Sequence, residues 1–174
     1  MNAATILRAT RVFDGERLLD SPHEVHIEDG RIVAIVPSQI PRDGVSADFN
    51  DATILPGLVD AHVHLSFDAS PDIGALARSD TPATAALRSA MNARRHLAAG
   101  VTAVRDLGSP QGIVVDVARA VGTPLLPVAP TIVAAGQVLT ITGGHGFFMG
   151  REVDGPDAFR RGARAEIKRG AGVI

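Results

Sequence analysis

The chain has 174 residues, of which 45% are hydrophobic and 21% are charged, and its formal net charge is −2. This composition is that of an ordinary globular domain, or of a small domain with part of another, and it excludes a disordered chain. The small net charge provides no basic field for nucleic acid or a membrane surface, and the absence of cysteine excludes disulfides, thiolate metal ligands and a cysteine nucleophile.

The N-terminal segment MNAATILRATRVFDGE lacks a long apolar core and carries Arg8 and Arg11, so it does not resemble a secretory signal. No run approaches the roughly 18 apolar residues of a membrane span. We therefore expect a soluble cytoplasmic protein. Aromatic residues make up only 3% of the chain, with no Trp or Tyr, and no aromatic-lined pocket is visible in the sequence.

Residues 1 to about 52 are expected to form short β-strands of a small β-sandwich module. The segment ATILRATRVF reads as one strand, and EVHIEDGRIVAIV reads as a hairpin whose turn is Asp29-Gly30. His23 and His26 belong to this hairpin, and we expect them at the surface.

From residue 53 onward, strand and helix patterns alternate. The apolar segment TILPGLVDAHVHL predicts a strand covered on both faces. A helix capped by Asp80 or Thr81, with Pro82 in its first turn, is expected to end at Gly100. Further on we expect, in order, a strand (VTAVRDLG), a helix (QGIVVDVARAV), an irregular strand (LLPVAPTIVAAG), a long loop (QVLTITGGHGFFMGREVDG), a helix from about 156 to 169, and the start of a fourth strand at 172–174. This alternation predicts an α/β fold with a parallel sheet, either doubly wound or closed into a barrel.

The chain stops at Ile174, within a strand-like run, whereas an eight-stranded barrel takes roughly 250 residues. We therefore expect residues 53–174 to be the first, incomplete part of a barrel in a longer chain. Taken alone, 174 residues would leave an open sheet edge and a half-built core.

The sequence His62-Val63-His64 is the strongest candidate for chemistry. Residues two apart on a strand point to the same face, so both imidazoles project together, with Asp60 one step deeper. Two imidazoles at this spacing can bind one divalent ion. The alternative is a pair of polar residues on a wet strand face, but unpaired imidazoles among apolar neighbours would be costly.

With its flanking Pro-Gly and Asp, LPGLVDAHVHL resembles the first barrel strand of the amidohydrolase superfamily. EDGRIVAI is similar to the hairpin that precedes this barrel, GVTAVRDLG to its second strand, and TGGHGFFMG to a loop of the imidazolonepropionase-like and prolidase-like branch. The resemblance implies a (β/α)8 TIM-like barrel and a binuclear centre, with two Zn²⁺ per full-length subunit. His62 and His64 would be metal ligands. The resemblance also implies a bridging carboxylated lysine, and we expect that lysine immediately after Ile174.

Three further residues are candidates for the site. The resemblance implies that His145, within Gly143-Gly144-His145-Gly146, contacts the substrate carbonyl or carboxylate; the alternative is a histidine in a mobile loop. Asp60 could orient a ligand imidazole from behind. Arg105 and Asp106 have opposite parity, so only one can face the interior, where Asp106 could support the ligands. For Asp60 and Asp106 a purely structural carboxylate is an equal alternative.

The sequence therefore predicts a metal-dependent hydrolase of C–N amide bonds, with a prolidase-like dipeptidase, a carboxypeptidase or an N-acyl amino acid hydrolase as first choice. A cyclic-amide hydrolase acting on an imidazolone-type ring and a non-catalytic barrel scaffold are the alternatives. The expected partner is a small-molecule amide or dipeptide, with neither nucleic acid nor a membrane, and a homo-oligomer stays open.

Overall fold

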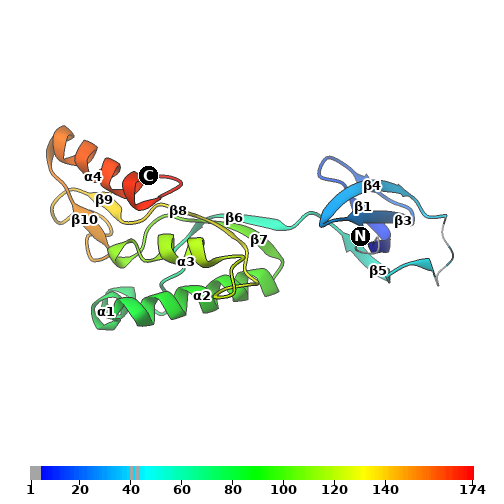
Figure 1. Ribbon diagram of the computed structural model, residues 1–174, viewed down its shortest axis with the longest axis horizontal. Coiled ribbons are helices and arrows are strands. Elements are labelled where there is room, and N and C mark those ends of the chain that lie inside the picture. The colour runs from blue at the N-terminus through cyan, green and yellow to red at the C-terminus, as the bar shows by residue number, and fades with distance from the viewer. Residues whose placement is uncertain (1–4, 40, 42–43) are drawn as a thin grey trace. The chain divides into compact units, whose positions relative to one another are not determined.

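The computed structural model describes residues 5–39, 41 and 44–174. Helices and strands are mixed, as expected for an α/β protein (Figure 1). The chain divides into two compact units, Met1–Pro56 and Gly57–Ile174. The last strand of the first unit continues to Ile54.

The first unit is a single hydrogen-bonded sheet of five strands in the order β2-β1-β3-β4, with β5 paired in parallel to β1. Its strands are β1 (Thr5–Phe13), β2 (Leu18–Leu19), β3 (His23–Glu28), β4 (Arg31–Pro37) and β5 (Ala47–Ile54). The predicted hairpin is confirmed: β3 and β4 are antiparallel, and Asp29 and Gly30 have φ values of 46° and 74°. Positive φ at both turn residues matches the twist of the strands that they join. Ala9, Val12 and Val25 form the buried core of this unit.

Two expectations for the first unit are modified by the structure. The strand ATILRATRVF is confirmed from residue 5 to residue 13, and its first residue lies outside the described part of the chain. His23 and His26, expected at the surface, are half-buried; His26 Nε2 lies 3.2 Å from Glu24 Oε2.

The single strand expected at residues 53–65 is wrong. Ile54 ends β5, the segment Leu55–Gly57 follows, and β6 runs from Leu58–Val63. Both faces of this strand were expected to be covered, but most side chains of β6 are exposed, and Val59 is 70% exposed. β6 lies at one edge of the sheet β6-β7-β8.

The second unit is built on this parallel three-stranded sheet, in which β7 is Val101–Asp106 and β8 is Thr131–Ala134. The predicted helices are confirmed as α2 (Pro82–Ala98), α3 (Val114–Ala120, after a short 3-10 turn, Pro110–Gly112) and α4 (Gly155–Arg169). In Figure 1, α2 and α3 run beside each other, α2 packing on β7 and α3 on β8. No helix in the described part of this chain has the length and apolar character that crossing a membrane requires.

Three local features of the second unit differ from expectation. The helix α1 (Ile73–Ser79) occupies a segment taken as loop, and Asp72 caps it. The long loop contains a parallel pair of short strands, β9 (Val138–Thr140) and β10 (Gly150–Glu152). The segment 172–174 is not a strand, although the Gly172 N–H donates to the Ala134 carbonyl at 2.9 Å.

A buried apolar cluster brings the carboxyl ends of β6 and β7 together. It contains residues from β6, β7 and β8, from the turn after β6 and from the covering helices: Val63, Leu65, Ala93, Val104, Val114, Val115 and Ala134. Burial of this cluster removes apolar surface from water and so holds the strand ends in register. His62, His64 and Asp106 lie at these strand ends.

Candidate functional site

His62 and His64 lie at the end of β6 with their rings in contact. The ring centres are 5.5 Å apart and the planes make an angle of 75°. Two imidazoles that bind one tetrahedral ion at about 2.0–2.1 Å place their ring centres roughly 5 Å apart. The observed spacing therefore fits two ligands of one ion. His62 is exposed and His64 is half-buried.

A backbone carbonyl orients His64. The Nδ1 atom of His64 lies 2.8 Å from the carbonyl oxygen of Gly108. Because a carbonyl can only accept, Nδ1 carries the proton and donates it, so in the neutral ring the lone pair is on Nε2. Metal-binding histidines characteristically use one ring nitrogen in this way and leave the other for the ion. Sequence reasoning missed Gly108; its only signal was the glycine that follows the strand VTAVRDL.

Asp106 is buried behind His64, at the end of β7. Its Oδ2 accepts the Leu65 N–H at 2.7 Å and its Oδ1 accepts the Gly108 N–H at 3.1 Å. Burial raises the pKa of this carboxyl to about 7, although both backbone hydrogen bonds favour the ionised form. Arg105 points away and is exposed, and its Nε donates to the Ala61 carbonyl at 2.8 Å. The two side chains leave opposite faces of β7, as the strand parity indicated, and Asp106 is the buried one.

Asp60 does not contact an imidazole through any hydrogen bond found among the described residues. Its Oδ1 accepts the backbone N–H of His62 at 3.1 Å. Asp60 is half-buried, and this hydrogen bond is to the backbone of the first histidine.

The glycine-rich segment that carries His145 approaches His64 through phenylalanines. His64 contacts Phe67 with ring centres 6.2 Å apart, and Phe67 contacts Phe148 at 6.3 Å. Phe148 in turn contacts Phe147 at 5.9 Å. His145 itself is exposed, in the turns between β9 and β10. Aromatic side chains thus gather beside the histidine pair, a clustering that the low aromatic content did not indicate.

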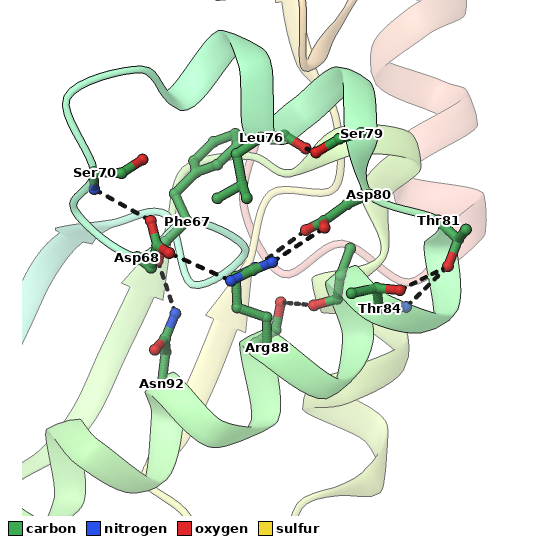
Figure 2. A network of polar contacts seen from close by, with 12 residues as sticks. Phe67, Asp68, Ser70, Leu76, Ser79, Asp80, Thr81, Thr84, Arg88 and Asn92 are labelled. Carbon is green, nitrogen blue, oxygen red and sulfur yellow. Dashed lines mark hydrogen bonds and ion pairs between the residues drawn. The ribbon is translucent and has the colours of Figure 1, made fainter.

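The turn after β6 is held by helix α2 (Figure 2). Asn92 Nδ2 donates to the carbonyls of Leu65 and Phe67, at 2.9 and 2.7 Å. Arg88 binds Asp80 with two nitrogens, at 3.1 and 3.0 Å, and reaches Asp68 at 3.4 Å. Sequence reasoning missed Asn92. Its signal was an asparagine in a helix interior, where it is intrinsically unfavourable unless its side chain has a specific partner.

Within residues 5–39, 41 and 44–174, no group of three or more His, Cys, Asp or Glu side chains could hold an ion. The spacing of His62 and His64 fits two imidazole donors, and the Gly108 carbonyl orients the second ring.

The profile of the amidohydrolase family matches residues 53–174. The chain belongs to this family, and the resemblance seen in LPGLVDAHVHL is confirmed. The family is generally metal-dependent.

The fold is similar to that of several solved structures. One is a prolidase complexed with N-methylphosphonate-L-proline, which is 32% identical with a TM-score of 0.78; the match covers 97% of this chain and 45% of the prolidase. Another is the A. niger ochratoxinase, 25% identical with a TM-score of 0.78, covering 98% of this chain and 46% of that one. The chain thus spans less than half the length of these proteins.

Curated relatives match over a shorter region. An allantoinase from Streptomyces avermitilis is 38% identical over 63 residues, which is 35% of this chain and 14% of the allantoinase. A dihydroorotase from Syntrophus aciditrophicus is 37% identical over 62 residues, 34% of this chain and 15% of the dihydroorotase.

Proposed function

We propose that the protein hydrolyses a C–N amide bond at a centre of divalent metal ions to which His62 and His64 contribute ligands. The main observation that supports this proposal is the pair His62 and His64, whose ring centres are 5.5 Å apart at the end of a parallel strand. In this proposal β6, β7 and β8 are the first strands of a (β/α)8 barrel, whose active site lies at the carboxyl ends of its strands. Residues 1–52 belong to a β-sandwich module that precedes the barrel.

The proposed centre holds two Zn²⁺ ions. Such ions, when bound, lower the pKa of water toward 7 and polarise a carbonyl oxygen. His62 and His64 supply imidazole nitrogens, and the Gly108 carbonyl accepts from Nδ1 of His64, which leaves Nε2 as the donor atom for the ion. In this proposal His145, which lies in an exposed glycine-rich turn, contacts the carbonyl or carboxylate of a substrate. Phe67 packs against the His64 ring, and Phe148 packs against Phe67.

The proposed substrates are dipeptides and N-acyl amino acids. The likeness to the prolidase supports this class, since it is 32% identical and extends over 97% of the chain. The ochratoxinase match has similar breadth.

A second candidate is hydrolysis of a cyclic amide. It is favoured by the local matches to an allantoinase and a dihydroorotase. These matches cover about a third of the chain, so we rank this function below hydrolysis of linear amides.

Metal analysis and a substrate panel test the proposal. The full chain is purified, its zinc is measured, and it is assayed before and after chelation with Xaa-Pro dipeptides, N-acyl amino acids and cyclic ureides. We expect bound zinc and chelator-sensitive cleavage of linear amides. His64→Ala should lose both metal and activity. His23→Ala, which removes a half-buried histidine of the first unit, is the matched control and should lose neither.

Two other outcomes of this experiment would contradict hydrolysis of linear amides. Opening of the cyclic compounds alone would establish the second candidate. A protein that folds and assembles without metal and cleaves nothing would be a barrel scaffold, and the proposal would be rejected.

A further inference from the structure

We propose that Asp106, assisted by Asn92, is a positioning residue that holds the His64 imidazole in its metal-binding orientation and tautomer. The inference rests on the proposed function, because it takes His64 as a ligand. Neither residue is proposed to touch the ion or the substrate.

Three hydrogen bonds and the peptide link between His64 and Leu65 form a closed ring that connects Asp106 to His64. From His64 the chain passes to Leu65, whose N–H donates to Asp106 Oδ2 at 2.7 Å. The other oxygen of Asp106 accepts the Gly108 N–H at 3.1 Å, and the Gly108 carbonyl accepts from His64 Nδ1 at 2.8 Å. One carboxylate thus holds both the backbone that carries the ring and the backbone that orients it.

Asn92 binds the backbone carbonyl of Leu65, the residue whose N–H is bound by Asp106. Leu65 is only 2% exposed, and while its N–H is held by Asp106, its carbonyl is held by Asn92. The Asn92 side chain is itself fixed, because its Oδ1 accepts from Arg95 Nη1 at 3.2 Å. Both backbone groups of the residue after His64 are therefore bound by buried side chains from two other elements, β7 and α2.

The burial of Asp106 argues for a dedicated role. A fully buried carboxylate is costly unless hydrogen bonds compensate for its lost hydration. Removing it would leave the Leu65 and Gly108 N–H groups without their acceptor and release the Gly108 carbonyl from its place. Hydrogen-bond partners of this kind typically change metal affinity on the order of 10- to 100-fold when they are mutated.

Glu166 provides a matched control. It is as buried as Asp106 and also accepts a backbone N–H, that of Gln137, at 3.3 Å. Its side chain also pairs with Arg169 at 3.1 Å. These contacts lie after β8 and in α4, and none of them is to the segment that carries His64. Glu166→Gln therefore reports the general effect of neutralising a buried carboxylate in this unit.

The test uses the full chain with and without Zn²⁺. Metal affinity is measured by competition with a chelator, the thermal stability of the metal-free protein by circular dichroism, and the His64 tautomer by ¹⁵N NMR of the imidazole. We expect Asp106→Asn to weaken zinc binding on the order of 10- to 100-fold and to give the metal-free His64 ring a mixture of tautomers. Asn92→Ala should act in the same direction. Glu166→Gln should lower stability but leave affinity and tautomer unchanged.

Unchanged zinc affinity and tautomer in Asp106→Asn would overturn the inference, and so would an equal loss of affinity in Glu166→Gln. Should Asp106→Asn not fold, Asn92→Ala carries the test, and an unchanged His64 in that variant overturns the inference. A wild-type protein that binds no zinc would refute the proposed function instead. The NMR comparison of wild type and variants without metal would still show whether Asp106 orients His64.

Discussion

Replacing Asp106 by Asn should change how the stability of the second unit depends on pH. The pKa of Asp106 is raised from 3.8 to about 7, first because of burial, against the opposing effect of its backbone hydrogen bonds. A carboxyl group whose pKa is higher in the folded state binds its proton more tightly there than in the unfolded chain. Its contribution to stability is therefore fully present below pH 3.8 and is lost as the pH rises toward about 7.

The size of this contribution follows from the two pKa values. The difference between 3.8 and about 7 corresponds to roughly 4 kcal/mol of folding free energy across that pH window. Asp106→Asn cannot ionise, so it should lack this dependence. The amide also turns an N–H toward one of the two backbone donors, which should cost about 1–3 kcal/mol at low pH.

Urea denaturation of the metal-free protein, followed by far-ultraviolet circular dichroism, measures the effect. The chain has no Trp or Tyr, and all of its described helices lie in the second unit, so the helical signal reports on the unit that contains Asp106. The wild type should lose its advantage over Asp106→Asn as the pH rises through this window. Other titrating groups cancel in the comparison. Parallel stability curves for the two proteins would refute the assignment of the raised pKa to Asp106.

Three substitutions, two of them with a companion variant, test local packing by thermal denaturation. Arg88→Lys loses the bidentate ion pair with Asp80, the C-cap residue of α1, and should lower the free energy of unfolding by about 1–2 kcal/mol. The control is Arg119→Lys, in an exposed ion pair within α3, which should change the free energy of unfolding by less than about 0.5 kcal/mol. Gly57→Ala would put a Cβ 2.1 Å from Thr102 Oγ1 and should cost at least about 1–3 kcal/mol; adding Thr102→Gly should recover part of the loss. Thr81→Ala removes the α2 cap that accepts the Thr84 N–H and should cost about 1 kcal/mol.

What the sequence predicted well depended on short-range patterns. The Asp29-Gly30 hairpin follows from a turn whose residues tolerate positive φ. The limits of α2 follow from Thr81 and Pro82 at one end and Gly100 at the other. The pairing of His62 with His64 follows from the two-residue period of a strand.

What the sequence could not predict depended on contacts between distant residues. Asp106 meets Leu65 from 41 positions away, Gly108 meets His64 from 44, and Asn92 meets Leu65 from 27. No local period marks such partners, because they are set by the packing of β7 and α2 against the end of β6. The parallel pairing of β9 with β10 was not predicted either. Each strand has only three residues, which is too short to show a periodic pattern.

The pairing of β5 with β1 bears on how the chain folds as it leaves the ribosome. Strand β5 is the last strand of the first unit. When Ile54 leaves the ribosome, the other strands of this sheet, β1 to β4, have already been synthesised. The first unit can therefore complete its sheet before the second appears, as domains generally do during synthesis. The orientation of the His64 ring is established later, because the ring has no carbonyl to bind until Gly108 has been translated and β7 has paired with β6. A ribosome arrested between these two points should carry a formed N-terminal sheet and an unoriented histidine pair.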